Sequence, residues 1–450
     1  MKETKRQMIP FSFYDLTGME AHLEDMARRG WMLQRITNWG WSYRRTEPRA
    51  VHFTISYYPR ASEFEPEPTE EQVTFQDFCR RSGWHLAAAS GRMQVFYNEQ
   101  EDPIPIETDP VLEVEMVSKA SRRMLPLHIV LLLLGFCMGG SWCYSLFHDP
   151  IGLLASASSL FMGLCWLGLF LYAAVDLTLY FTWLFRAKRA ARQGEFLPTR
   201  GCHRLMQGIE VLTVAGLVYW LLVSRLPGGQ LLFLVMLLGY AALVLIVNGT
   251  KELLKRKKVS AKVNRAVTLA VDGVLALAIM GGISLGLVQV FRSGAFSIAD
   301  YLETPVSAAE LLGTDSGAYT VSTSFDTSAL VTRQEFRQWS RTQPDLPGLE
   351  LTVVKVHIPS LYELCFSQLY HAYDAAPETD ATGAVYIPGT AYREVNAASW
   401  GAQTAYRLYE GETPTNRYLL CWPGQLAELS ADWDLTPEQI TAAGAELTPS

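Results

Sequence analysis

The stretch DMARRGWMLQRI, residues 25–36, decides how the first part of this chain folds, because a close copy follows it. The copy is DFCRRSGWHLAA, residues 77–88. Each version has an arginine pair, then Gly-Trp, then a short apolar run. Apolar residues at helical spacing precede Gly30, and glycine is typical of a helix end because it adopts a left-handed conformation without strain. We therefore predict one local unit, written twice: helix, Gly-Trp, strand.

The neighbouring residues extend the two copies into one α+β domain. Further strands are predicted at MIPFSF (residues 8–13), WSYRR (41–45), VHFTISYY (51–58) and RMQVFYN (92–98), from their short alternating patterns. Asp15 is in the place of a helix N-cap. The sequence thus predicts a domain over residues 1–110 with helices on one sheet face, for which a ferredoxin-like sandwich is the nearest label.

The two Gly-Trp pairs, Gly30–Trp31 and Gly83–Trp84, have two interpretations. In one, the tryptophans form a stacking platform for a ligand or a nucleic acid. In the other, each tryptophan packs its helix onto the sheet directly after the turn. We favour the second because the phrase takes the same structural place twice. Residues 1–125 contain 16 Lys+Arg and 19 Asp+Glu, which argues against nucleic-acid binding.

The same residues carry a family resemblance. The features are FSFYDLTGMEAHLEDMARRGWML (11–33), FCRRSGWHL (78–86), VFYN (95–98) and EDPIPIETDP (101–110). Residues 11–109 thereby resemble a bacterial membrane-protein family known as domain of unknown function 2812. Its members are often encoded beside PadR-like transcription regulators, so the resemblance implies a role in membrane sensing or stress response. It implies no catalytic residue.

The middle of the chain has a different composition. Residues 126–292 contain 15 Lys+Arg and 6 Asp+Glu, and residues 293–450 contain 7 and 20. Crossing the hydrocarbon core of a bilayer takes about 20 apolar residues in a helix. Spans are predicted at 127–147, 152–171 with a continuation to 185, 206–224, 230–248 and 266–291. The sequence therefore predicts a linker at 111–125 and then a five-helix transmembrane bundle. The second run is predicted as one helix because no turn residue divides it.

The basic residues between the spans predict an orientation. Six Lys and Arg lie within residues 186–204, and seven lie within residues 251–265. Loops rich in these residues stay in the cytoplasm. We expect a multi-pass protein of the bacterial cell membrane with a cytoplasmic N-terminus and an extracytoplasmic C-terminal domain. The opening residues contain no apolar signal-peptide core, which agrees with a cytosolic first domain.

Three acidic residues interrupt the spans: Asp176, Glu210 and Asp272. Ionisable groups inside spans are functional candidates by default. All three are predicted near the cytoplasmic ends of their helices, so we favour pairing with the neighbouring Lys and Arg over a transport path. The segment GGISLG, residues 281–286, matches a hydrolase motif with Ser284 as nucleophile, but that motif needs a strand-turn-helix elbow. In an apolar helix, close packing through small residues is the better explanation.

Residues 293–450 are predicted to form an extracytoplasmic α+β domain with a twisted antiparallel sheet. One helix is predicted after Ser360 and Glu363, which have capping-box spacing, and another with Thr436 as N-cap and Pro437 as first residue. Strands are predicted at TAYRLYEG (404–411), NRYLLCW (416–422) and QLAELS (425–430), and a surface loop at APETDATGA (376–384).

The cysteines and histidines of this domain give weak functional signals. Cys365 and Cys421 are its only cysteines, and could form a disulfide in an oxidising compartment; buried free thiols are the alternative. His357 and His371 have no carboxylate at ligand spacing, so no metal site is predicted. The chain shows no nucleophile–base pattern, phosphate-binding glycine loop or zinc signature, and we expect no cofactor.

These observations favour a non-enzymatic sensor or regulatory protein that links an extracytoplasmic domain to a cytosolic interaction domain. A transporter or transporter accessory subunit is the alternative, and its motivation is the three intramembrane acids. The expected partners are the lipid bilayer and a cytosolic regulatory protein, with no nucleic acid. A homo-oligomer stays open.

Overall fold

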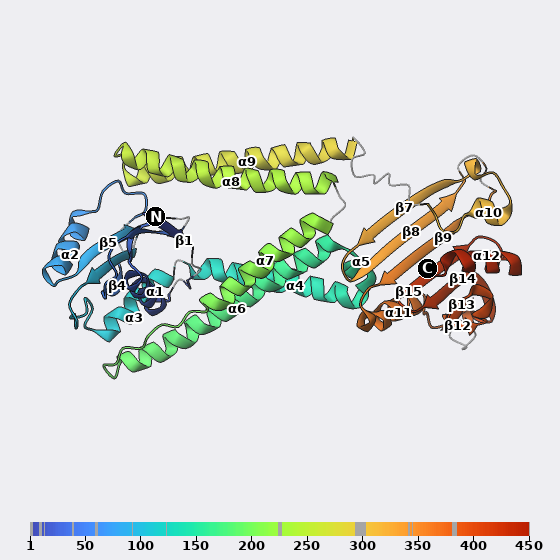
Figure 1. Cartoon of the computed structure of the whole chain (residues 1–450), viewed down its shortest axis with the longest axis horizontal. Coiled ribbons are helices and arrows are strands. Elements are labelled where there is room, and N and C mark those ends of the chain that lie inside the picture. The colour runs from blue at the N-terminus through green and yellow to red at the C-terminus, as the bar shows by residue number, and fades with distance from the viewer. Residues whose placement is uncertain are drawn as a thin grey trace. The chain divides into compact units, whose positions relative to one another are not determined.

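The computed structural model describes residues 3–8, 11–12, 14–37, 40–58, 62–91, 93–122, 124–223, 227–292, 303–340, 343, 345–379 and 385–449 (Figure 1). Contacts divide the chain into two compact units. Unit 1 consists of Met1–Gly139, Cys165–Ala215 and Leu226–Phe296; unit 2 consists of Gly140–Leu164, Gly216–Arg225 and Ser297–Ser450. Each unit is described by itself.

The N-terminal domain, residues 3–122 of unit 1, contains the same β-α-β-β unit twice. The first copy is β1 (Thr4–Gln7), α1 (Leu16–Arg28), β2 (Trp31–Thr37) and β3 (Gly40–Arg45); the second is β4 (His52–Tyr57), α2 (Glu70–Arg81), β5 (His85–Ser90) and β6 (Met93–Asn98). Their antiparallel sheets have the equivalent orders β1-β3-β2 and β4-β6-β5. The duplicated phrase therefore produces a duplicated fold, and each Gly-Trp follows a helix as predicted.

This topology differs from two details of the prediction. A ferredoxin-like fold runs β-α-β-β-α-β, whereas the described elements run β-α-β-β twice, in two three-stranded sheets. The leading strand is at Thr4–Gln7 and pairs with β3. The predicted strand at residues 8–13 lies partly outside the described residues, because Ile9, Pro10 and Phe13 are not among them.

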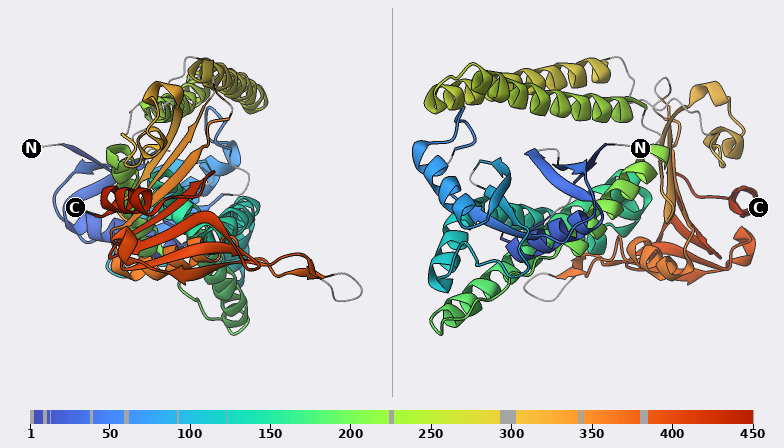
Figure 2. Two further views of the ribbon diagram at one scale, coloured as in Figure 1. Left: turned by 90° about the vertical axis from the view of Figure 1, so that its right-hand side faces the viewer. Right: turned by 60° about the vertical axis from the view of Figure 1, so that its left-hand side comes forward.

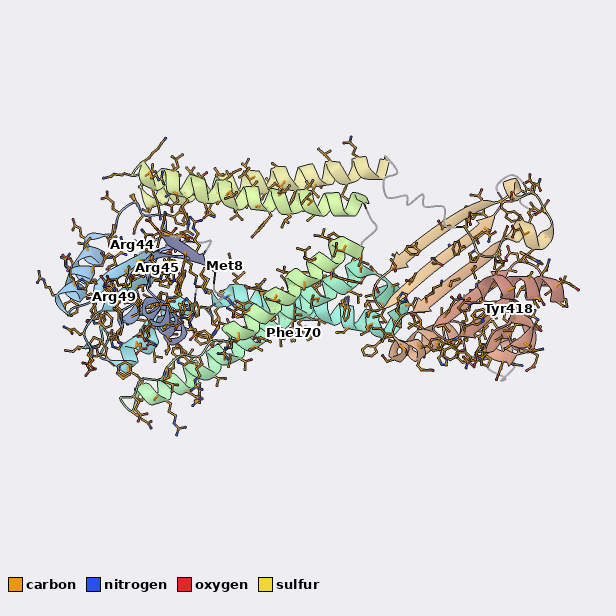
Figure 3. The ribbon with its side chains drawn as sticks, viewed as in Figure 1. Met8, Arg44, Arg45, Arg49, Phe170 and Tyr418 are labelled. Atoms are coloured by element: carbon orange, nitrogen blue, oxygen red, sulfur yellow. The ribbon has the colours of Figure 1, made fainter. Side chains whose placement is uncertain are left out.

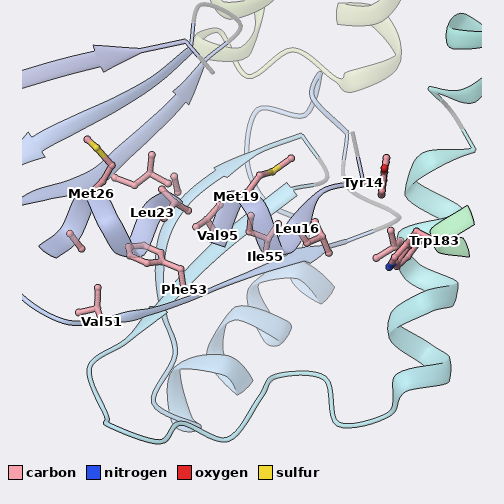
Figure 4. Packing of buried hydrophobic residues seen from close by; sticks show 14 of the residues in the cluster. Tyr14, Leu16, Met19, Leu23, Met26, Val51, Phe53, Ile55, Val95 and Trp183 are labelled. Carbon is pink, nitrogen blue, oxygen red and sulfur yellow. The ribbon is translucent and has the colours of Figure 1, made fainter. Parts of the chain in front are cut away.

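One hydrophobic core joins the two sheets, which meet where β2 lies beside β5. Helix α1 buries the face formed by Leu16, Met19 and Leu23 against Phe53 and other sheet residues, as Figure 4 shows. Each such side chain contributes roughly 1.5–3 kcal/mol when it is fully buried. This core therefore takes residues from both copies, whereas α2 of the second copy packs in a smaller separate cluster with Cys79, Trp84 and Phe96.

Most of the predicted linker, residues 111–125, is helical. Helix α3 (Pro110–Ser121) begins after Asp109, whose carboxylate accepts the backbone N–H of Val111 at 2.8 Å. It buries Val114 and Val117 in the core of the N-terminal domain. The domain thus extends to the start of the first long apolar helix.

Five described helices are long and apolar enough to cross a membrane. They are α4 (Leu125–His148), α6 (Ala157–Ala191), α7 (His203–Val223), α8 (Pro227–Arg256) and α9 (Ala261–Arg292). The second apolar run is divided near its start, contrary to prediction. The short helix α5 (Pro150–Ala155) ends at Ser156, which has an extended backbone, and α6 then continues unbroken for 35 residues.

Glycines bring the first long helices into close contact. In unit 1, a Cβ at Gly135 of α4 would lie 2.8 Å from the backbone of Phe170 in α6, so only glycine fits there; Figure 3 labels Phe170. Small residues of this kind let helix backbones approach each other in a membrane. Helices α8 and α9 lie side by side as a pair. The GGISLG glycines of α9, Gly281, Gly282 and Gly286, have no described atom within 4 Å of the position that a Cβ would take, so no described contact of this chain uses the predicted packing motif.

The C-terminal domain, residues 303–449 of unit 2, contains an antiparallel sheet of seven strands (Figure 2). Its order is β12-β13-β14-β15-β9-β8-β7, from β7 (Thr320–Thr327), β8 (Val331–Trp339), β9 (Leu349–Val356), β12 (Thr390–Val395), β13 (Thr404–Glu410), β14 (Thr413–Trp422) and β15 (Gln425–Ala431). The antiparallel sheet and the three strands β13 to β15 were predicted. A two-stranded ribbon, β10 (Glu378–Thr379) with β11 (Val385–Ile387), lies where a loop was predicted, and residues 380–384 of that loop are outside the described part.

Both faces of this sheet are covered, because side chains alternate along each strand. In β14, Leu420 and Trp422 face a core that includes α12 (Pro437–Leu447), whereas Leu419 and Cys421 face a second core. The second core contains α11 (Tyr362–Tyr370) and the short helix α5. Helix α10 (Ala308–Leu312) also packs near α12. The segment between the first two long helices is therefore part of the C-terminal core.

The two predicted caps in this domain have different outcomes. Thr436 caps α12 in a full capping box with Gln439, and Pro437 is its first residue, as predicted. The predicted capping box of Ser360 and Glu363 is wrong: α11 begins at Tyr362 after a 3₁₀ turn, and no side chain caps it.

Gly30 tests the predicted helix stop. It has φ of +79°, and a Cβ there would lie 2.8 Å from the carbonyl oxygen of Thr46. Gly194 has φ of +78° with no atom within 4 Å of a Cβ, so it is a matched control. Gly194→Ala should cost about 1 kcal/mol for the left-handed conformation alone. Gly30→Ala should cost clearly more, measured as the thermal unfolding midpoint of the purified chain; equal midpoints would contradict this account.

Candidate functional site

The strongest candidate site of unit 1 surrounds Asp176, one of the three intramembrane acids. Its side chain is fully buried on α6. Its Oδ1 accepts the hydroxyl of Ser12 at 2.5 Å and lies 3.8 Å from Sγ of Cys202. Its Oδ2 lies 3.5 Å from Nε2 of His128 in α4 and accepts no hydrogen bond from the described residues. Three segments distant in sequence thus converge on a carboxylate that a fourth, α6, carries.

His128 has a defined protonation pattern in this site. Its Nδ1 lies 3.0 Å from the carbonyl oxygen of Met124, which can only accept, so Nδ1 carries a proton. Its Nε2 lies 3.1 Å from the hydroxyl of Tyr172. With Nδ1 as the donor to Met124, the neutral ring accepts the hydroxyl hydrogen of Tyr172 at Nε2.

A second set of bonds surrounds the start of α1. Asp15 caps the helix through Gly18 N–H at 3.1 Å, as predicted, and the same Oδ1 accepts the hydroxyl of Thr199 at 3.2 Å. Thr17 and Thr199 bond each other reciprocally, with each backbone N–H donating to the other's hydroxyl at 2.9 and 3.0 Å. A Cβ at Gly201 would lie 2.4 Å from Asp15 Oδ2, so this position needs glycine. The cap of α1 and the segment before α7 form one structure.

Aromatic packing also stabilises the contact between the start of α1 and the segment before α7. Tyr14 is fully buried and donates its hydroxyl to the carbonyl of Arg200 at 3.0 Å. Its ring centroid lies 5.3 Å from that of Tyr180 and 5.8 Å from that of Trp183, beside which Figure 4 shows it. Burial raises the pKa of the Tyr14 hydroxyl, which therefore stays protonated. The segment 11–17 thus attaches the N-terminal domain to α6 and to residues 199–202.

The second repeat has its own attachment, to α8 and α9. Lys251 lies 3.2 Å from Glu63, and Lys258 lies 2.7 Å from Glu67. The buried Asn264 donates its amide to the carbonyl of Phe64 at 3.1 Å. Residues 62–67 precede α2 as residues 11–15 precede α1, so equivalent segments of the two repeats bind two helix groups. The acidic run EFEPEPTEE, residues 63–71, is a sequence signal for this contact that the prediction missed.

The other intramembrane acids lie elsewhere. Glu210 is exposed on α7, and Asp272 is half-buried on α9. Neither makes an ion pair in the described part of the chain, and the predicted partners, Lys and Arg, do not surround Asp176. The structure therefore does not gather the three acids into one path.

In the structure, the residues of the two Gly-Trp pairs form helix stops and pack within the N-terminal domain. Gly83 has φ of +87°, and Trp84 is buried and donates its indole N–H to the carbonyl of Ile104 at 2.8 Å. Trp31 is half-buried, with the guanidinium of Arg45, labelled in Figure 3, 5.1 Å from its ring centre. The geometry agrees with tryptophans that pack after a helix stop.

In unit 2, the candidate residues do not form a metal or redox site. Cys365 and Cys421 are buried, free thiols, so the disulfide alternative is not the state of this structure. His357 bonds Thr332, and His371 bonds Asp374. No group of three His, Cys, Asp or Glu side chains in the described residues is placed to hold a metal ion.

Unit 2 does contain a charged cavity that the sequence did not indicate. Its volume is about 220 Å³, and Arg417 and Glu428 line it, 3.4 Å apart. Tyr392 donates to Glu428 at 2.8 Å, and the guanidinium of Arg417 lies 4.4 Å from the ring centre of Tyr373. These residues come from separate strands and the segment after α11. A small polar ligand could replace one partner of such an ion pair and bind the other.

The five apolar helices between two α+β domains define a multi-pass membrane protein. Residues 15–129 match the family described as Protein of unknown function (DUF2812), which confirms the resemblance and extends it through α3 into α4. No curated protein and no solved structure matches the chain.

Ser12→Ala tests the Asp176 contact. It leaves the buried carboxylate without its hydroxyl donor, which costs about 1–3 kcal/mol. Burial, and then the charge of Asp176, raise the pKa of the Cys202 thiol and slow its reaction with maleimide. Loss of the Ser12 hydrogen bond alone would raise the Cys202 pKa further, but the weakened contact should expose the thiol more often. We expect this exposure to decide the rate, so that Cys202 in the variant reacts roughly tenfold faster, as quantified by mass spectrometry of its peptide. Glu210→Gln is the control, and an unchanged rate for Ser12→Ala would refute the contact.

Proposed function

We propose that this chain is a non-enzymatic sensor or regulatory protein of the bacterial cell membrane, which couples an extracytoplasmic C-terminal domain to a cytosolic N-terminal domain. One observation carries the proposal: α4, α6 and α7 each contribute residues to both compact units. Their units change at Gly139/Gly140, Leu164/Cys165 and Ala215/Gly216, within unbroken helices. A helix that belongs to both units can pass a displacement from one to the other.

The basic loops support the proposed orientation. Positive loops remain in the cytoplasm, and residues 186–204 and 251–265 adjoin the segments to which the N-terminal domain is bound. The pairing of Lys251 and Lys258 with acidic residues of that domain requires them on one side of the bilayer.

The C-terminal domain has features expected of the domain that binds a signal molecule. Its core includes α5, and the backbone N–H of Ile151 in α5 donates to Gln368 of α11 at 2.7 Å. The hydroxyl of Ser328 donates to the carbonyl of Leu154 at 2.5 Å. A ligand that shifted the sheet would therefore act on the connection between α4 and α6. The charged cavity around Arg417 is the place where such a ligand would bind.

The N-terminal domain would carry the output, through a cytosolic partner. The family resemblance supports a regulatory output, because its members are often encoded beside PadR-like regulators. The alternative of a transporter has less support, since Asp176 is sealed by Ser12 and His128 while Glu210 and Asp272 lie apart from it.

Labelling of engineered cysteines tests the orientation. Glu446→Cys on α12 should react with a membrane-impermeant maleimide in intact cells, whereas Glu101→Cys, also exposed, should react only after permeabilisation. The unmodified chain measures the background labelling of the native cysteines. The reverse pattern would overturn the orientation.

Transcript profiles under cell-wall stress test the function. Deletion of the gene should change a defined set of transcripts, and Ser12→Ala should reproduce part of that change because it weakens the domain contact. Glu210→Gln is the matched control and should behave like the parent. If deletion changes no transcript, the sensor proposal fails.

A measurement of solute flux tests the transporter alternative. If the triple variant Asp176→Asn, Glu210→Gln, Asp272→Asn abolishes such a flux, the transporter function is supported instead of the sensor function.

A further inference from the structure

The N-terminal domain contains a cavity of about 400 Å³ that the foregoing function does not use. It lies between the two repeats. Its lining comes from α1 of the first repeat, from β4 with Tyr58 and from α2 of the second, from α3, from the segment Pro105–Glu107, and from Phe196, which follows α6. Its volume is within the range of small-molecule sites, which is roughly 300–1,000 Å³.

The cavity is acidic and holds no compensating base. Glu20, Glu107 and Glu113 line it, and no Lys, Arg or His is among its described lining residues. Glu20 Oε1 accepts the backbone N–H of Ile55 at 2.9 Å, and Glu113 has no ion pair in the described part of the chain. Burial raises the pKa of Glu20 to about 7, and burial followed by the charge of Glu107 raises that of Glu113. Carboxylates in such surroundings are stabilised by a cation.

Aromatic and aliphatic side chains form the rest of the lining. Tyr57, Tyr58 and Phe75 contribute rings, and the centroids of Tyr58 and Phe75 are 6.0 Å apart. Leu16 and Val117 contribute apolar surface from α1 and α3. Aromatic faces attract cations with weak hydration, such as substituted ammonium groups. A metal ion would need converging ligands, and the described residues contain no such group.

We propose that this cavity binds an organic cation with an apolar body, such as a substituted ammonium compound. The carboxylates would pair with its charge and the rings would enclose its apolar part. The proposal does not rest on the sensor function or on the side of the membrane where the domain lies.

The titratable groups around the cavity predict its pH dependence. They are Glu20 from α1, Tyr57 from β4, Tyr58 directly after it, Glu107 from the segment before α3, and Glu113 from α3. Outside the lining, Glu71 of α2 accepts the hydroxyl of Tyr58 at 3.1 Å, and the charge of Glu24 on α1 also raises the pKa of Glu20. Burial raises the pKa of Tyr57 to about 12, so it stays neutral. Below pH 7 a bound cation must displace the proton of Glu20. Cation affinity should therefore rise as pH increases from 6 to 8.

Calorimetric titration of the full chain in phosphatidylcholine nanodiscs tests the proposal, with benzyltriethylammonium as probe and empty nanodiscs as blank. Benzyl alcohol and phenylacetate are the neutral and anionic comparisons, and we expect only the cation to bind. Glu20→Gln and Glu113→Gln should each weaken binding about tenfold. Glu115→Gln is the matched control: Glu115 is on the same helix, exposed, paired with Lys119 and outside the cavity lining, so its variant should bind like the parent.

Thermal unfolding without ligand checks that each variant is folded, and Glu107→Gln replaces any variant that is not. Equal binding of benzyl alcohol or phenylacetate would overturn the proposal. So would parental affinity in both Glu20→Gln and Glu113→Gln, or binding that Glu115→Gln weakens as much as they do.

Discussion

The carboxylate of Asp176 is the constraint on which the N-terminal half of the structure depends. A buried charge costs free energy unless it is paired and hydrogen-bonded. Here the hydroxyl of Ser12 donates a hydrogen bond to Oδ1, and the ring of His128 lies 3.5 Å from Oδ2, on the other side of the contact. Because the carboxylate is fully buried, a shift of the N-terminal domain along α6 would leave it without the hydroxyl of Ser12. Apolar packing around Tyr14 and Trp183 adds area, but the hydrogen bonds fix the position.

The same domain meets the helices twice, with unequal chemistry. The contact at Ser12 is buried, whereas the pair of Lys258 with Glu67 is exposed and the pair of Lys251 with Glu63 is partly exposed. Exposed ion pairs contribute little, typically about 0–1 kcal/mol, and salt screens them. The second contact also contains the buried amide of Asn264, which needs its carbonyl partners. The first attachment is therefore firm and the second is the more easily released.

Local signals predicted local structure well. Asp15 and Gly30 mark the ends of α1, and Thr436 with Pro437 marks the start of α12, because caps act within one turn of their helix. Asp109 and Pro110 carried the same signal for α3, and it was overlooked. Strands β7 (TVSTSFDT) and β8 were missed because their side chains are mostly polar; no residue of β7 is fully buried, and only four of β8 are. The partners of Asp176 could not be predicted, since Ser12 is 164 residues away and no pattern links them.

The duplication of the β-α-β-β unit gives the domain two equivalent docking segments, one for each helix group. In the terms of multivalent binding, the first attachment holds the second at a high effective concentration, so a weak second contact can stay formed without much affinity of its own. Such a contact is sensitive to small changes in the distance between the repeats. The cavity lined by Glu20 and Tyr57 lies between those repeats. An occupant of that cavity would therefore act as a spacer, and a modest change in spacing could decide whether α8 and α9 are held or released.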